Sequence, residues 1–183
     1  METLWARSAL SEEEAVVRLE RLSRGSVFSL RRWWGGPSVR CRVECVFLPC
    51  RRVDYAESVR SADGFILVNG YSRQAQWVSP GLSLSSTTAL ENKFPYPLSK
   101  ETTLDLARKA YLSWRLGRLT RSPRDSADFV AGALVMYPYW ARYAENRRGR
   151  IRLEIVDGVT GHPGGVMVKQ AYLEALKSGK DAG

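Results

Sequence analysis

The pattern of apolar and polar residues predicts a strand pair in the second half of the chain. The run from Phe129 to Tyr137 is almost wholly apolar and rich in β-branched and aromatic residues, which favours a buried strand. Pro138 lacks an amide donor, so we expect a bulge or bend there before an extended continuation to Tyr143. Residues Arg150 to Val156 then alternate between apolar and polar, which predicts a half-buried antiparallel return strand.

Further strands are expected in the first half of the chain. Residues 39–47 alternate between apolar and polar side chains, and residues 51–60 and 64–71 predict two more strands. The segment 72–98 contains a Ser-Pro-Gly sequence, a Ser/Thr cluster and the piece Phe-Pro-Tyr-Pro. We expect this segment to be a long irregular loop whose Phe-Pro-Tyr-Pro piece covers the protein's own core.

Three helices are predicted from capping residues and apolar periodicity. Ser11 and Glu14 have the spacing of a capping box before an apolar stripe. Ser99 caps a second helix that is apolar on more than one side, so we expect burial between two layers or at an oligomer contact. A third helix is expected from Val166 to Lys177, ended by Gly179. We expect the helices to cover one face of the sheet.

The two halves of the chain resemble each other. Residues 46–49 match residues 135–138, and the sequence Tyr-Ala-Glu occurs at both 55–57 and 143–145. Because a helical pattern precedes each match, we infer a duplicated helix–strand–strand–strand unit with a period near 88 residues. The predicted fold class is therefore α+β, a duplicated helix–antiparallel β-meander unit with a C-terminal helix. The two halves are expected to be residues 1–90 and 91–183 of one compact domain.

One stretch of the second half resembles a known family. Residues Arg150 to Gly161 combine a strand with the turn Asp-Gly-Val-Thr-Gly. This stretch is similar to the strand and Asp-Gly-x-Thr-Gly turn of PepSY-type modules, which are cystatin-like helix-plus-sheet units, and the repeated order of helix and strands adds to the resemblance. The resemblance implies a non-catalytic module of a kind that is often exported.

The composition adds a strong positive charge. The 183 residues carry 28 basic and 19 acidic side chains, a net charge of +9, with 22 arginines and 6 lysines. The planar arginine fork suits phosphate and carboxylate groups, although a GC-rich genome also produces arginine-rich proteins. The sequence shows neither an apolar run of transmembrane length nor a secretory signal, so we expect a cytoplasmic protein without a membrane span.

Candidate chemistry is sparse. Cys41 and Cys45 lie too far apart on a strand to share a zinc ion or a disulfide, so we expect these thiols and Cys50 to be buried and free. His162, with Asp157 to orient it, would have to serve any nucleophilic site, but no nucleophile motif accompanies it. We predict no catalytic residue, metal or cofactor. A phosphate-cradling loop is a weaker candidate than a plain connecting turn, and its residues are Asp157, Gly161, His162, Gly164 and Gly165.

Three functions stay open at this point. The leading hypothesis is a non-enzymatic accessory subunit that binds a protein partner or larger complex through a basic, aromatic-containing surface, with homo-oligomers also allowed. The second is a nucleic-acid-binding protein, which depends on the arginines forming one patch. The third is a small-ligand binder or enzyme with a pocket near residues 157–165. The candidate contact residues for the first two are Arg31, Arg32, Trp33, Trp34, Arg147, Arg148 and Arg150.

Overall fold

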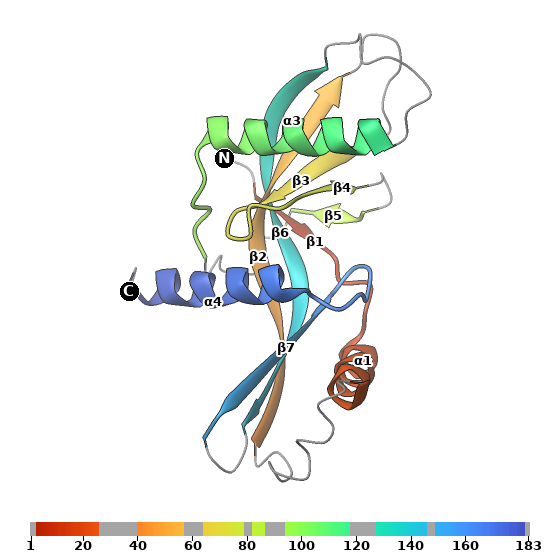
Figure 1. Cartoon of the computed structure of the whole chain (residues 1–183), viewed down its shortest axis with the longest axis vertical. Helices are drawn as coiled ribbons and strands as arrows, with labels where there is room; N and C mark the ends of the chain where they lie inside the picture. The colour runs from red at the N-terminus through yellow and green to blue at the C-terminus, as the bar shows by residue number, and fades with distance from the viewer. Residues whose placement is uncertain are drawn as a thin grey trace. The chain divides into compact units, whose positions relative to one another are not determined.

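The computed structural model describes residues 3–25, 40–56, 64–78, 82–86, 94–117, 127–145 and 149–181. Within these ranges the chain forms three helices and a seven-stranded sheet, which confirms the α+β class (Figure 1). The helices are α1 (Glu12–Gly25), α3 (Lys100–Gly117) and α4 (Val166–Asp181). The strands are β1 (Thr3–Ala6), β2 (Arg40–Ala56), β3 (Phe65–Asn69), β4 (Ala75–Val78), β5 (Leu84–Ser85), β6 (Asp128–Glu145) and β7 (Ile151–Asp157).

Two long strands, β2 and β6, are neighbours in the sheet, whose order is β4-β3-β2-β6-β1-β5 with β7 paired to β6. β6 pairs parallel with β1 and antiparallel with β7, and β3 pairs antiparallel with both β2 and β4. Arg142 of β6 donates to the sulfur of Cys41, whereas Arg51 further along β2 donates to the Gly132 carbonyl. β2 and β6 therefore run in opposite directions.

Both long strands continue through a proline. β2 has 17 residues and includes Pro49, and β6 has 18 residues and includes Pro138. The prediction of separate strands at 39–47 and 51–60 is therefore wrong. Each proline carbonyl still accepts a hydrogen bond, from Gly70 N at Pro49 and from Gly158 N at Pro138, both at 3.0 Å. A proline lacks a donor but keeps its acceptor, so the strand can pass through it when its carbonyl finds a partner.

Other boundaries also differ from the sequence-based expectations. The segment 72–98 contains β4 and β5 and is not wholly irregular. Its Phe94 is buried, and the Tyr96 hydroxyl is hydrogen-bonded to Thr103 Oγ1 at 2.9 Å, so this piece does pack against the protein's own core. α4 continues past Gly179 to Asp181. None of the described helices is long and apolar enough to span a membrane.

The helix starts follow the predicted caps. Glu14 N donates to Ser11 Oγ at 3.2 Å, and Ser11 N donates to a Glu14 carboxylate oxygen at 3.0 Å, which confirms the capping box of α1. Thr102 N donates to Ser99 Oγ at 3.2 Å at the start of α3. These bonds satisfy amides that the first turn of a helix leaves without partners.

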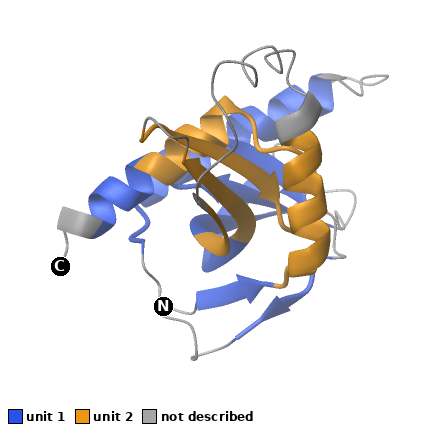
Figure 2. Cartoon of the chain, turned by 90° about the horizontal axis from the view of Figure 1, so that it is seen from below, with its two compact units in different colours: residues 1–6, 48–137, 174–183 blue, residues 7–47, 138–173 orange. Residues whose placement is uncertain are grey.

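The chain divides into two compact units that are interleaved along the sequence (Figure 2). Unit 1 comprises residues 1–6, 48–137 and 174–183, and unit 2 comprises residues 7–47 and 138–173. Each unit takes one end of β2 and one end of β6.

The core of unit 1 lies between α3 and the strands β2, β3 and β4. Val53, Ile66 and Val68 of the sheet are almost completely buried with Tyr111 of α3. Trp77 stacks on Trp114 beside them, with ring centroids 4.6 Å apart. Apolar burial between one helix and three strands therefore holds this unit together.

In unit 2, α1 and α4 lie on opposite faces of the sheet. Neighbouring strand residues point to opposite faces. Arg142 of β6 interacts with Glu20 of α1, whereas Tyr143 is hydrogen-bonded to Tyr172 of α4. The expectation that the helices cover one sheet face is therefore wrong for this unit.

Candidate functional site

The predicted contact residues Arg31, Arg32, Trp33, Trp34, Arg147 and Arg148 lie outside the described residues. Arg150 lies within them and is exposed. The described strands nevertheless fix where these two segments join the sheet. β2 begins at Arg40, just after the first segment, and the second segment connects the end of β6 to Gly149.

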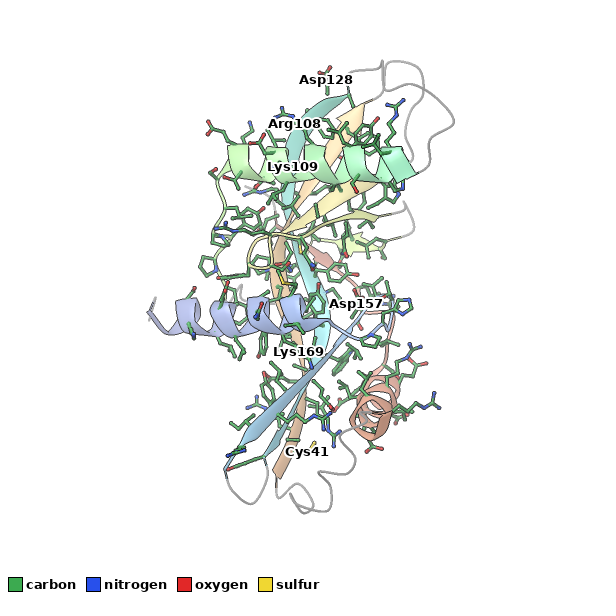
Figure 3. All side chains as sticks on the ribbon, viewed as in Figure 1. Cys41, Arg108, Lys109, Asp128, Asp157 and Lys169 are labelled. Carbon is green, nitrogen blue, oxygen red and sulfur yellow. The ribbon has the colours of Figure 1, made fainter. Side chains whose placement is uncertain are left out.

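These attachment points lie at one end of unit 2. Arg142 Nε donates to Cys41 Sγ at 3.1 Å, so the start of β2 lies beside the last residues of β6. Glu145 pairs with Ile151, so β7 begins at the same place. Figure 3 labels Cys41 at this end of the sheet. Both candidate segments therefore connect to the same end of the unit.

Three exposed arginines lie at this end. The side chain of Arg42 is 76% exposed and that of Arg152 is 53% exposed, and Arg150 is also exposed. Ile151 is 69% exposed, which is unusual for a large apolar residue in a strand. We define the arginine end as Arg42, Arg150, Ile151 and Arg152, which lie at one end of the sheet but on both of its faces: Arg42 shares the face of its partner Glu44, whereas Arg152 shares the opposite face with Glu154.

A buried carboxylate lies beneath the arginine end. Glu154 of β7 is only 4% exposed, although the alternating pattern placed it on the polar face with Arg150 and Arg152. Its oxygens lie 2.8 Å from Arg152 and 3.5 Å from Arg142. The hydrogen bond to Cys41 raises the pKa of Arg142, and the charges of Glu154 and Glu20 raise it further. The charged side chains on this face of the sheet are therefore buried as ion pairs.

The opposite face of the same sheet carries a tyrosine–glutamate cluster, comprising Glu44, Tyr143 and Tyr172. Tyr143 Oη donates to Glu44 Oε1 at 2.8 Å, and Tyr172 Oη lies 3.2 Å from the same oxygen. The two tyrosine hydroxyls are also hydrogen-bonded to each other. Arg42 lies 2.6 Å from the other Glu44 oxygen. Burial raises the pKa of Tyr143, and its bonds with Tyr172 and Glu44 raise it further.

This cluster joins α4 to β2 and β6. Burial likewise raises the pKa of Tyr172, which is 1% exposed, while its bond with Tyr143 lowers it. The cluster thus keeps neutral phenols around a carboxylate that an arginine also contacts. Its geometry fits a structural anchor for α4, because no side chain in it is both exposed and without a partner.

The predicted ligand loop is a tightly hydrogen-bonded turn. Asp157 Oδ1 accepts from the amides of Val159 and Thr160, both at 2.8 Å, and the Asp157 carbonyl accepts from Gly161 N at 2.9 Å. Gly164 N donates to the Ile155 carbonyl at 2.7 Å. His162 and Gly165 are exposed. Most amides that could face an anion therefore donate within the protein.

The same turn occurs in unit 1, 88 residues earlier. Asn69 Oδ1 accepts from Tyr71 N and Ser72 N, and the Asn69 carbonyl accepts from Arg73 N. Asn69 N donates to the Gln74 carbonyl, as Asp157 N does to that of His162. Val68 pairs with Ala75, and Val156 with Pro163. Each of these contacts in unit 1 has its counterpart at a constant spacing of 88 residues.

α1 contacts this turn through the side chain of Arg18. Arg18 Nη1 donates to the Gly161 carbonyl at 3.0 Å. Arg18 also lines a shallow open hollow together with Glu13, Glu14, Val17 and Arg21. The carboxylate of Glu14 accepts a hydrogen bond from Ser11 N in the cap of α1. Glu14 and Arg18, two of the charged residues that line this hollow, are therefore engaged in contacts within the protein.

The cysteines differ in exposure. Cys50 is buried, Cys45 is partly buried and Cys41 is exposed, so the expectation of three buried thiols is wrong for Cys41. Burial raises the pKa of Cys45 to about 11, which keeps it protonated. Within the described parts of the chain, no three histidine, cysteine or acidic side chains are grouped in a way that could hold a metal ion.

Comparison of the chain with family models, curated proteins and solved structures finds no match. The function is therefore argued from the charges, exposure and contacts of the described residues.

Proposed function

We propose that this protein is a non-enzymatic binding module that holds an anionic macromolecular partner at the arginine end. One observation carries the proposal: Arg42, Arg150 and Arg152 are exposed where β2, β6 and β7 meet, and two further arginine-containing segments connect there. Sequence places Arg31 and Arg32 in one segment and Arg147 and Arg148 in the other. Arginine binds phosphate and carboxylate oxygens in pairs, which suits a repeating anion.

The net charge alone is weaker support than this arrangement. Several described arginines serve the fold: Arg52 pairs with Asp54 at 2.7 Å, Arg51 donates to Gly132, and Arg115 donates to the Tyr111 hydroxyl. Their forks bind internal carboxylates, carbonyls and a phenol, which gives the arginine-rich composition a structural use. Arg42 and Arg152 also pair with carboxylates, Glu44 at 2.6 Å and Glu154 at 2.8 Å, but their side chains stay 76% and 53% exposed, and exposed arginines at one end of a sheet are a more specific sign of a partner than the net charge.

Nucleic acid is the partner class to test first. The combination of exposed arginines and Ile151 with the sequence Trp33-Trp34 that precedes β2 in the chain suits a single strand whose phosphates pair with arginine and whose bases stack on the aromatic rings. An acidic protein is the alternative partner. A small-ligand site at residues 157–165 has less support, because the amides of that turn donate internally and a matching turn occurs in unit 1.

The test is fluorescence anisotropy of a labelled mixed-sequence oligonucleotide, single- and double-stranded, at low and physiological salt. We expect binding that weakens steeply as salt rises. The variant Arg147→Gln/Arg148→Gln/Arg150→Gln should weaken it by at least about tenfold. A control variant, Arg108→Gln/Lys109→Gln, removes two positive charges from α3 in unit 1 and should have much less effect per charge removed. Failure to bind at low salt would refute a nucleic-acid partner and direct the search to acidic proteins.

We also propose that the chain arose by duplication of a helix–strand–strand–strand unit. α1 begins at Glu12 and α3 at Lys100, and β2 begins at Arg40 and β6 at Asp128, so both pairs are 88 residues apart. The matching turns after β3 and β7 keep the same spacing. The PepSY-like turn that begins at Asp157 thus has a counterpart at Asn69, which supports a tandem of related modules.

A further inference from the structure

The backbone of β7 points away from β6 at alternate residues. Among the described strands β7 pairs with β6, and Figure 1 shows it as the outer strand of unit 2. Gly158 N donates to a carbonyl of β6, whereas Asp157 N donates outward to the turn that follows β7. Because backbone groups alternate in direction along an antiparallel strand, the amides and carbonyls of Ile151 and Leu153 also point outward.

The matching edge in unit 1 is covered by a strand of the chain itself. β3 corresponds to β7 at the spacing of 88 residues that relates the two turns. β4 pairs antiparallel along the outer edge of β3, from Val68 opposite Ala75 to Phe65 opposite Val78. In unit 1, the occupant of this edge is therefore an extended, antiparallel strand.

In unit 2 the chain leaves this edge where α4 begins. At the spacing of 88 residues, β4 corresponds to residues 163–166. Gly164 N still donates to the Ile155 carbonyl at 2.7 Å, but the helix starts at Val166. A β-carbon added to Gly165 would have no neighbouring heavy atom within 4 Å, so the space at this point is open. The described part of the chain thus supplies no counterpart of β4 in unit 2.

The side chains along β7 indicate what an added strand should carry. Ile151 is 69% exposed and Leu153 is half-buried, and both lie on the face that α4 covers. Arg152 lies on the other face and is 53% exposed, and its partner Glu154 is shared with Arg142. A strand with apolar residues opposite Ile151 and Leu153 and an acidic residue opposite Arg152 matches this pattern.

A second copy of β7 does not match it. An antiparallel copy centred on Arg152 sets this arginine opposite itself, and a copy centred on Ile151 sets Arg150 opposite Arg152. A copy centred on Leu153 would need the edge at Ile155, whose carbonyl already accepts a hydrogen bond from the turn. Like charges directly opposite each other are unfavourable, so the arginines disfavour pairing between two copies.

We propose that the outer edge of β7 binds an extended acidic segment of a partner protein, which joins the sheet antiparallel to β7 as β4 joins β3. The outward backbone groups of Ile151 and Leu153 bind its main chain, and Arg152 selects its acidic residue. Glu145, which is opposite Ile151, lies on β6, on the far side of β7 from this edge. A nucleic acid would use the arginines but not the outward amides. The inference names a protein partner for the arginine end and rests on the proposed binding role of that end.

The probe is a short fluorescein-labelled peptide in which valine and glutamate alternate, mixed with the full chain. In the proposed pairing the valines lie opposite Ile151 and Leu153, so their amides face β7 and the glutamate amides face solvent. Methylating the valine amides should weaken binding by at least about tenfold, whereas methylating the glutamate amides should leave it nearly unchanged. The two methylated peptides have the same composition and charge, so their comparison isolates the backbone contact.

Two variants of the chain test the same contact from the other side. Leu153→Pro removes one outward amide and leaves the bonds to β6 in place, because proline is tolerated where the amide of an edge strand faces solvent. It should bind the peptide at least about tenfold more weakly than Leu153→Ala, which keeps the amide. Leu153→Pro should leave oligonucleotide binding unchanged. Circular dichroism checks that both variants fold.

Three results would overturn the inference. They are failure of the unmethylated peptide to bind, equal binding by the two methylated peptides, and equal peptide binding by Leu153→Pro and Leu153→Ala with unchanged circular dichroism. Dimerisation of the parent chain in sedimentation that Leu153→Pro abolishes would assign the edge to a second copy and also refute it. If oligonucleotide binding accompanies any of these results, the proposed function stands without this inference. Peptide binding with the expected methylation pattern but without oligonucleotide binding would support the inference and refute the nucleic-acid partner.

Discussion

Arg73 and Gly161 have nearly the same backbone conformation although only one is glycine. Their φ angles are +54° and +71°, in the left-handed region, and each donates its amide to the carbonyl four residues earlier. A residue with a side chain is strained there. We therefore expect Arg73→Gly to be tolerated and to raise the free energy of unfolding by about 0.5 kcal/mol, as measured by urea titration.

Replacing the glycine at the matching position, Gly161, should destabilise the protein. A β-carbon at Gly161 would collide with the guanidinium of Arg18, which crosses directly over it. Gly161→Ala should therefore lower the free energy of unfolding by more than 1 kcal/mol, roughly the strain at such an angle plus the displaced contact. If Arg73→Gly is strongly destabilising, the turn after β3 does not have the conformation described.

The tyrosine–glutamate cluster gives a pH-dependent prediction. Burial and hydrogen bonding raise the pKa of Tyr143 in the folded protein, whereas an unfolded tyrosine ionises near pH 10. The folded state therefore keeps a proton that the unfolded state releases. The associated stability is fully present below about pH 10 and is lost as the pH rises above it.

Thermal unfolding between pH 8 and pH 11 tests this directly. Tm should fall more steeply above pH 10 in the parent protein than in Tyr143→Phe, which lacks the ionising group. Comparing the slopes removes the contribution of lysines that both proteins share. At pH 7 the variant should lose about 1 kcal/mol, because Glu44 loses one donor. Identical slopes would show that the Tyr143 hydroxyl is not held as described.

Sequence reasoning works at this scale when the partners are close along the chain. The capping box of Ser11 and Glu14 is legible because its two members are three residues apart. The cluster of Glu44, Tyr143 and Tyr172 is not legible, because its members come from two strands and a helix separated by 99 and 29 residues. Likewise, the alternation of β7 could not reveal that Glu154 is buried, since α1 covers its face.

At the scale of elements, two strand pairs can be compared: β3 with β2, and β7 with β6. The apolar residues of the first pair can be tested as replacements for the charged residues of the second. Val53 pairs with Ile66 under α3, whereas Arg142 pairs with Glu154 on the face that α1 covers. Removing one charge of a buried ion pair leaves the other charge buried without a partner, which lowers the free energy of unfolding. Replacing both charges with apolar residues often leaves that free energy unchanged. Glu154→Ile should cost about 3 kcal/mol, and Arg142→Val added to it should recover most of this loss.

The measurement is a double-mutant cycle by urea unfolding, with circular dichroism as the check that all variants fold. The interaction free energy between the two sites should exceed 1 kcal/mol. A double variant no more stable than Glu154→Ile would mean that this face of unit 2 cannot accept the apolar pair of unit 1. That result would also weaken the proposed duplication.

Helices and strands themselves were largely predictable, and their ends less so. Periodicity and caps place α1, α3 and β7, because these depend on local patterns. An extended continuation of β6 past Pro138 was expected, but the continuity of β2 through Pro49 was not predicted, because it depends on a bond from Gly70 of a distant turn to the Pro49 carbonyl.

At the scale of the whole molecule, the units are assembled from both halves of the sequence. Unit 2 combines the start of β2 with the end of β6, so residues about 100 positions apart meet, as Cys41 and Arg142 do. A linear sequence gives no sign of which strand ends are neighbours. The sequence predicted the arginines of the candidate site as separate clusters, and only the strand pairing shows that their attachment points share one end.

The most direct test of the account is the salt dependence of oligonucleotide binding by the parent protein and by Arg147→Gln/Arg148→Gln/Arg150→Gln. The logarithm of the association constant should fall linearly with the logarithm of salt concentration, with a slope of about −0.7 for each phosphate neutralised on a single strand. We predict that the variant lowers the magnitude of this slope by about one to two, while Arg108→Gln/Lys109→Gln leaves it nearly unchanged. Equal slopes for all three proteins, or no binding by the parent at low salt, would contradict a nucleic-acid site at the arginine end.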